Sequence, residues 1–158
     1  MKRTFGVVVV GMLVALFLAC LGCSSSDAGP SVSGLWKETG CSMGFSIEGQ
    51  DFIEYMSVPP KGTKTFAGVI VNSPDLSAPS GLIVVRVTDV GMSARYGAAA
   101  GTYTVARWKN LTETTVGQTN AKDAAFHPIF YATEAEARAL TEDSPELNRF
   151  CCQVSNRS

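Results

Sequence analysis

Cysteine and histidine carry the most versatile side-chain chemistry in this sequence, which contains five cysteines and one histidine. Thiolates and imidazoles bind metal ions and serve as nucleophiles or bases. Beyond residue 40 the cysteines are Cys41 and the adjacent pair Cys151 and Cys152, with no Cys-x-x-Cys spacing among them. His127 precedes a proline and has no cysteine or paired carboxylates as sequence neighbours. No Gly-x-Ser-x-Gly or His-Glu-x-x-His motif occurs. The sequence therefore predicts no catalytic residues, no metal site and no enzymatic activity.

The other two cysteines follow a segment typical of exported proteins. Lys2 and Arg3 precede an apolar run over residues 5–19. A run of this length is too short for a membrane-spanning helix, which needs about 20 apolar residues. A basic start, a short apolar stretch and small residues at its end are the features of a secretory signal peptide. We therefore predict a signal peptide over residues 1–19.

The end of this segment, Leu16-Phe17-Leu18-Ala19-Cys20, resembles the lipobox of bacterial lipoproteins. The resemblance implies cleavage before the cysteine, with covalent diacylglycerol and fatty acyl groups, such as palmitate, attached to it and no other cofactor. Cys20 has the unbroken apolar run before it; Cys23 is the alternative, because it precedes a serine-rich stretch. A secreted protein with an ordinary cleavage site and an uncleaved anchor are the remaining alternatives. Asp27 does not directly follow either cysteine, which favours the outer membrane.

Composition limits the remaining possibilities. The chain has 158 residues and a formal net charge of −1, with 46% hydrophobic and 17% charged residues. This length suits one domain, the apolar content excludes a fully disordered chain, and the charge excludes a strongly basic surface for nucleic acid. Removal of the signal peptide also removes Lys2 and Arg3, so the mature chain is more acidic. We predict a lipidated tether over residues 20–32 and one folded domain over residues 33–158.

The folded part reads mainly as β-strands. Alternating or β-branched segments bounded by Gly, Pro, Asn and Asp predict strands over residues 34–39, 45–48, 51–58, 65–72, 82–89, 102–109 and 114–119, with a closing strand near 150–154. Residues 91–101 are rich in small side chains and predict a long loop. Thr133 and Glu136 form a capping-box pattern, which predicts one short helix that ends at Ser144-Pro145. Seven or eight strands with one late helix indicate an antiparallel sandwich or closed barrel, and a barrel leaves no exposed edge.

Several segments together resemble a group of small, uncharacterised spirochaetal lipoproteins with a lipocalin-like, calycin-type β-barrel. The resemblance lies in residues 68–72 (GVIVN), 81–85 (GLIVV), 108–112 (WKNLT) and 132–137 (ATEAEA). Gly34-Leu35-Trp36 is also similar to the Gly-x-Trp that opens the first strand of lipocalins. The resemblance implies a fold and an envelope location and carries no catalytic residues. The C-terminal Cys151-Cys152 departs from it.

A closed barrel makes its first and last strands neighbours. A disulfide from Cys41 to Cys151 or to Cys152 would then close a loop of about 110 residues, which the chain-entropy treatment values at roughly 4–5 kcal/mol. Adjacent cysteines on a strand point to opposite faces, so only one of the pair reaches Cys41 easily. The other is then buried, free, or paired with Cys23 if Cys20 carries the lipid.

Aromatic residues on the predicted strands belong in the barrel, where they either fill its core or line a cavity. If the barrel is hollow, the residues expected to line the cavity are Trp36, Phe45, Tyr55, Tyr103 and Trp108. Two functions follow from these alternatives. A hollow barrel indicates a protein that binds a small apolar or amphipathic molecule, whereas a filled barrel indicates a structural or protein-interaction lipoprotein. Both lie in the cell envelope, in the periplasm or at the cell surface.

Overall fold

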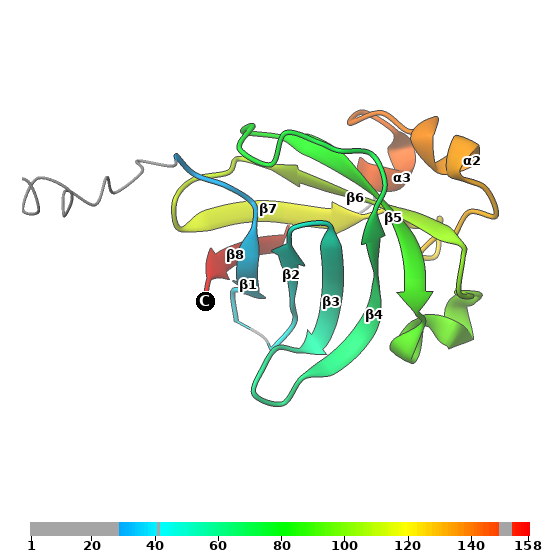
Figure 1. Ribbon diagram of the computed structural model, residues 1–158, viewed down its shortest axis with the longest axis horizontal. Helices are drawn as coiled ribbons and strands as arrows, with labels where there is room; N and C mark the ends of the chain where they lie inside the picture. Colours follow the sequence, from blue (N-terminus) through cyan, green and yellow to red (C-terminus); the bar gives the residue numbers. More distant parts are fainter. Residues whose placement is uncertain (1–28, 41, 149–152) are drawn as a thin grey trace, which may run out of the picture.

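A computed structural model describes residues 29–40, 42–148 and 153–158, and these residues form an eight-stranded antiparallel β-barrel (Figure 1). Each strand pairs with the next along the chain, and the last strand pairs with the first. The strands are β1 (Gly34–Glu38), β2 (Gly44–Glu48), β3 (Asp51–Ser57), β4 (Thr63–Ile70), β5 (Gly81–Asp89), β6 (Tyr103–Lys109), β7 (Thr115–Asn120) and β8 (Gln153–Arg157). The predicted mainly-β fold with a closed antiparallel barrel of the lipocalin-like type is confirmed.

The ladder between β1 and β8 closes the barrel. Lys37 pairs with Asn156 and Glu38 pairs with Ser155, and the Thr39 amide donates to the Val154 carbonyl at 2.9 Å. Every strand thus has two neighbours, so none of them presents a free row of backbone donors and acceptors to another chain.

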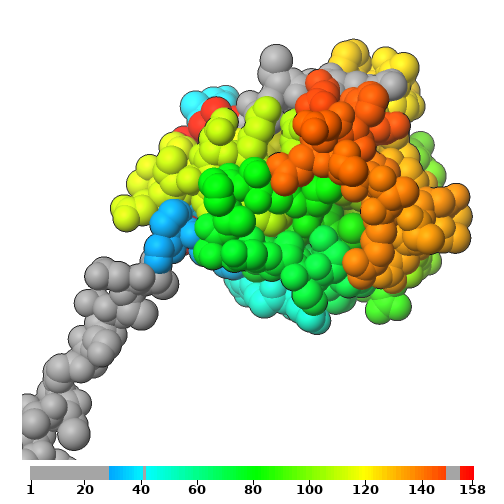
Figure 2. All heavy atoms as spheres, turned by 90° about the horizontal axis from the view of Figure 1, so that it is seen from above, coloured from blue at the N-terminus to red at the C-terminus, as the bar shows by residue number. Residues whose placement is uncertain are grey.

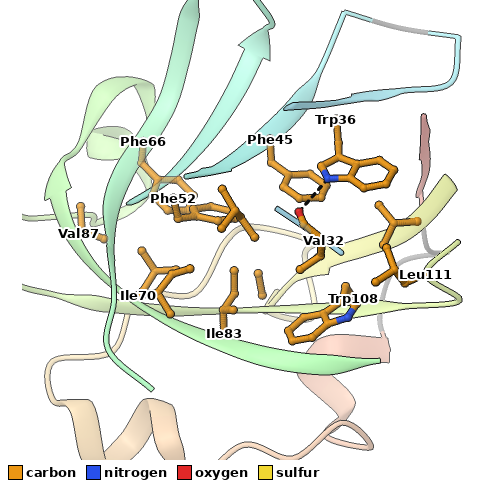
Figure 3. Close-up of a cluster of buried hydrophobic side chains, with 14 residues drawn as sticks. Val32, Trp36, Phe45, Phe52, Phe66, Ile70, Ile83, Val87, Trp108 and Leu111 are labelled. Atoms are coloured by element: carbon orange, nitrogen blue, oxygen red, sulfur yellow. Dashed lines mark hydrogen bonds between the residues drawn. The ribbon is translucent and has the colours of Figure 1, made fainter. Parts of the chain in front are cut away.

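Aromatic side chains fill the centre of the barrel (Figure 3). Trp36, Phe45, Phe52 and Phe66 form a continuous series, with successive ring centroids 6.3, 6.2 and 5.6 Å apart. All four side chains are almost fully buried. Alternation along each strand directs these residues to one face, and the curvature of the closed sheet makes that face the interior. The barrel therefore has a packed aromatic core.

The segment before β1 covers one end of this core. Val32 is 1% exposed, and its carbonyl accepts a hydrogen bond from the Trp36 indole N–H at 2.8 Å. The Arg157 guanidinium lies 4.7 Å from the centre of the Trp36 ring, and it donates to the Ser31 carbonyl at 2.6 Å. The chain is therefore already packed against the barrel at Val32, one residue before the predicted start of the domain.

The chain between β7 and β8 crosses the outside of the barrel and carries two short helices, α2 (Glu134–Arg138) and α3 (Pro145–Asn148). Ala137 and Leu147 from these helices pack against Val84 of β5 and Val105 of β6. Figure 2 shows this segment, in orange, lying against the green strands. The described residues therefore form two clusters, one inside the barrel and one beneath the helices. No helix among them is long and apolar enough to cross a membrane.

Three local predictions were wrong. Residues 91–101, predicted as a loop, contain the 3₁₀-helix η1 (Gly91–Tyr96), which ends at Gly97 with a φ of 84°. Pro145, predicted to end the only helix, instead begins α3. Proline lacks an amide hydrogen, but the first residue of a helix needs none, so proline is well suited to that position. The helix that was predicted to run to Ser144-Pro145 is α2, which already ends at Arg138. The closing strand, predicted near 150–154, extends to Arg157, whereas β1 to β7 lie within two residues of their predicted positions.

The capping box of α2 is confirmed, and it leads to a first prediction. The Glu136 amide donates to the Thr133 hydroxyl at 3.3 Å, and the Thr133 amide donates to the Glu136 carboxylate at 2.9 Å. We expect Thr133→Ala to lower the free energy of unfolding by about 1 kcal/mol and to speed hydrogen exchange in α2, because a helix this short relies on its cap. Thr114→Ala, at an exposed loop position, is the control. Equal exchange rates in α2 of the two variants would contradict the prediction.

Candidate functional site

A polar cavity lies at the end of the barrel where β1 ends. The chain enters β1 at Gly34, beside the covered end of the core, and the cavity begins at Glu38. Its volume is about 250 Å³, and it is partly open to solvent. Its lining residues belong to β1, β2, β3, β7 and β8 or lie within two residues of their ends; they are Glu38, Met43, Gly44, Glu54, Tyr55, Gln118, Thr119, Asn120, Lys122 and Ser155. The cavity thus adjoins an apolar core, and most of its lining residues carry polar or charged side chains.

Strand alternation places a carboxyl group in this cavity. Phe52 points into the core, and Glu54, two residues later on β3, shares its face of the strand. The Asn120 side-chain amide donates a hydrogen bond to the Glu54 carboxylate from β7. The Gln118 amide in turn donates to the Asn120 side-chain oxygen at 2.7 Å. The result is a short relay of donors that ends on Glu54.

The surroundings of Glu54 favour its neutral form. Burial raises the pKa of Glu54 from 4.5 to about 7, and the nearby Glu38 carboxylate acts in the same direction. The Asn120 hydrogen bond and the positive charge of Lys122 lower the pKa but do not offset the burial. Glu54 therefore changes its charge near neutral pH, a range in which an exposed glutamate is fully ionised.

This environment predicts a pH-dependent stability. Because the folded state binds the Glu54 proton more tightly than the unfolded state does, the stability contributed by this group is fully present below about pH 4.5 and is lost as the pH rises through 7. Part of the Glu54 surface still faces the cavity, so we expect the change to be about 2–3 kcal/mol. Urea unfolding of the wild type and of Glu54→Gln between pH 4.5 and 8 measures it.

Glu54→Gln is the reference for this measurement, because glutamine keeps the acceptor for the Asn120 amide and cannot ionise. The stability of Glu54→Gln relative to wild type should therefore rise by that amount across the range. Glu48→Gln removes an exposed carboxylate at the end of β2 and should keep the wild-type pH profile. Parallel profiles for wild type and Glu54→Gln would contradict the pKa assigned to Glu54.

The structure separates the five aromatic residues expected to line a cavity. Tyr55 lines the polar cavity, whereas Trp36, Phe45 and Trp108 belong to the core cluster. Tyr103 packs in the outer cluster beneath the helices. Tyr103 and Trp108 lie five positions apart on β6, and alternation puts residues at an odd separation on opposite faces. They could not both face the interior, and this part of the expectation is corrected.

All five cysteines, Cys20, Cys23, Cys41, Cys151 and Cys152, lie outside the described residues. Their lipidation and disulfide pairing therefore stay predictions. The premise of the disulfide, that the first and last strands are neighbours, is confirmed by the pairing of β1 with β8. Peptide mapping under non-reducing conditions tests the pairing itself, and a free thiol at Cys41 would reject it.

His127 lies in an exposed turn outside the cavity. Its Nδ1 atom is 3.4 Å from the Asp123 carboxylate, and its ring stacks on Tyr96 with centroids 5.5 Å apart. The backbone amide of His127 also donates to the Asp123 carboxylate at 2.9 Å, which holds the turn. Across residues 29–40, 42–148 and 153–158, no three His, Cys, Asp or Glu side chains are grouped as a metal site would require.

Sequence reasoning missed Glu54 and Asn120. The available signal was one carboxylate on the apolar face of a strand, since Phe52 and Glu54 share a face. Buried carboxylates are costly and need polar partners. Asn120 lies just beyond the predicted end of its strand, so the sequence pattern did not indicate that its side chain faces inward.

Comparison of the chain with protein-family models, with curated protein sequences and with solved structures finds no match.

Proposed function

We propose that this protein is a non-catalytic lipoprotein of the bacterial cell envelope that binds a small polar molecule in the cavity beside Glu54. A lipid on Cys20, or alternatively on Cys23, anchors it to a membrane, with the outer membrane favoured. Two or three acyl chains make such anchoring stable, at about 0.8 kcal/mol for each buried CH₂ group. The resemblance to spirochaetal lipoproteins supports the same location.

The arrangement of the barrel interior supports a polar ligand over an apolar one. The series from Trp36 to Phe66 occupies the centre of the barrel, where an apolar guest would have to sit. The described cavity instead presents carboxylate, amide and hydroxyl groups. At about 250 Å³ it is smaller than the roughly 300–1,000 Å³ of typical ligand pockets, so its ligand is small. The polar cavity is the observation that carries the proposal.

The direction of β1 also suits an anchored binding protein. The chain reaches β1 at Gly34, and the cavity lies at the Glu38 end of the same strand. The chain from residue 29 onward therefore reaches the barrel at the end away from the cavity, as the blue segment before β1 in Figure 1 illustrates. Anchoring would leave the cavity facing away from the membrane.

Two experiments test the proposal. Mass spectrometry of the mature N-terminus, from the full chain expressed in a bacterial host, should find an acylated Cys20 or Cys23; a free residue after Ala19 or Gly22 would refute the anchor.

To test binding, a fragment library with cationic, neutral and anionic members is added to the detergent-extracted protein. Binding should shift the amide resonances of Gly44, Gln118 and Asn120. No shift at these amides with any fragment would refute the binding function.

A second candidate function is docking of an envelope protein, which one exposed apolar group favours. Met92 and Tyr96 of η1 are 38% and 37% exposed, and Phe126 is 55% exposed. The stacking of Tyr96 on His127 brings the turn that holds Phe126 next to η1. Crosslinking in cells from Tyr96 or Phe126 should capture one defined partner if this candidate is correct, and crosslinks from neither position would eliminate it.

A further inference from the structure

The cavity beside Glu54 has the charge of a cation site. Its described lining holds two carboxylates, Glu38 and Glu54, against the single positive charge of Lys122. The lining residues from β2 and β8, Gly44 and Ser155, carry no charge. When both carboxylates are ionised, the described walls of the cavity therefore have a formal negative charge. This charge would repel an anion and attract a cation.

The carboxylates of the cavity leave acceptor positions for a ligand. The Asn120 amide already donates to Glu54, and the Gln118 amide donates to Asn120. One N–H group of each amide is therefore used within the protein. The carboxylates of Glu54 and Glu38 have more acceptor sites than this relay occupies, because a carboxylate has about four lone-pair positions. A ligand with N–H groups would use them.

Met43 adds apolar surface to the cavity. Tyr55 follows Glu54 on β3, and its hydroxyl lies 3.4 Å from that of Ser46. Ser46 stands between the core residues Phe45 and Ile47, so the Tyr55 ring faces away from the carboxylates. A thioether side chain beside two carboxylates suits an ammonium group that carries a short alkyl chain, which an inorganic ion lacks. The two carboxylates supply at most four of the six to eight oxygen ligands that Ca²⁺ takes, so a Ca²⁺ ion would need several further oxygens from amides, hydroxyls or water.

Resting on the proposed binding function, we propose that the ligand is a small organic cation, a protonated alkylamine, which forms an ion pair with Glu54 and displaces the proton of its carboxyl group to solvent. The N–H groups of the ammonium donate to Glu54 and Glu38, and its alkyl part contacts Met43. No covalent bond forms or breaks except the O–H bond of Glu54.

Proton release gives the proposal a measurable signature. Burial raises the pKa of Glu54 to about 7, with Glu38 raising it further and Lys122 and Asn120 opposing. A bound ammonium would stabilise the ionised carboxylate and lower that pKa. Alkylamines stay protonated through this range. The affinity for the amine should therefore increase about tenfold with each unit of rising pH up to 7, and should be constant at higher pH. Nearly one proton should be released per ligand at pH 6, and almost none at pH 8.5.

Three compounds of matched shape test the charge assignment: isobutylamine, isobutyramide and isobutyrate. Calorimetry uses the full mature protein in detergent, in two buffers of different ionisation enthalpy. Isobutylamine should bind, with the proton release above, and the other two compounds should not. Glu54→Gln should weaken isobutylamine binding by about 10- to 100-fold and abolish the proton release. Glu38→Gln should weaken it less, and Glu48→Gln should leave both unchanged.

The outcomes distinguish this inference from the function on which it rests. Binding of isobutyramide or isobutyrate as tight as that of the amine, with shifts at Gly44 and Asn120, would overturn the cation assignment and leave the binding function standing. Tight binding of Ca²⁺ at the same amides would do the same. Amine binding without proton release at pH 6 would overturn the ion pair with Glu54. Failure of every fragment of any charge would overturn both proposals.

Discussion

Trp36→Ala is expected to lower the free energy of unfolding by about 3–5 kcal/mol, which is a large part of the stability of a typical domain. The Trp36 side chain is fully buried and stacks on Phe45 with ring centroids 6.3 Å apart. Its removal leaves a cavity, breaks the hydrogen bond to Val32 and takes away the ring under Arg157. The covered end of the barrel thus loses three contacts at once.

Urea unfolding followed by circular dichroism and by the fluorescence of Trp108 measures this effect. Met92→Ala, at a position that is 38% exposed, should change the free energy of unfolding by no more than about 0.5 kcal/mol. A loss below about 1 kcal/mol in Trp36→Ala would mean that this end of the barrel is not packed as described.

Arg107→Met should lower the free energy of unfolding by about 3–4 kcal/mol, chiefly by releasing the helical segment from the barrel. Arg107 lies on the outer face of β6 and is 5% exposed. Its guanidinium donates to the Glu142 carbonyl at 2.6 Å and to the Asn148 side-chain oxygen at 2.7 Å. Methionine has similar length and fills much of the space, but it donates no hydrogen bonds, so both acceptors lose a charged partner.

Hydrogen exchange resolves this effect by region. Amides of α2 and α3 should exchange much faster in Arg107→Met, because the helical segment opens locally. Amides of β2 and β3 should still exchange only through unfolding of the whole barrel, at the rate set by the free energy of unfolding of the variant. Arg86→Met, at an exposed position on β5, is the matched control and should leave α2 and α3 as in wild type. Unchanged exchange in α3 of Arg107→Met would show that other contacts hold the segment.

Local patterns in the sequence were enough to predict most of the barrel. The alternation over residues 102–109 corresponds to β6, and the β-rich segment over 51–58 corresponds to β3. Both patterns depend on the two-residue period of a strand, which is a property of neighbouring residues. The capping box of α2 succeeded for the same reason, because all of its groups lie within four residues.

The misses concern features for which local signals are ambiguous or absent. Pro145 is compatible with the end of one helix and the start of another, and only the burial of Leu147 against the outer cluster selects the second. The contact between Glu54 and Asn120 joins residues 66 positions apart on opposite sides of the barrel end. Neither residue reveals the other in the sequence, so the cavity could be found only after the strands were arranged in space.

The pairing of Lys37 with Asn156 joins residues about 120 positions apart, so the ladder that closes the barrel raises the contact order of the fold. Chains dominated by such distant contacts fold in milliseconds to seconds, far more slowly than helical bundles of similar size. The ladder between β1 and β8 cannot form until nearly the whole chain is available. For a lipoprotein of the cell envelope, as we propose, this delay would be useful, since a polypeptide that folds late can still be threaded through a membrane channel before its barrel closes.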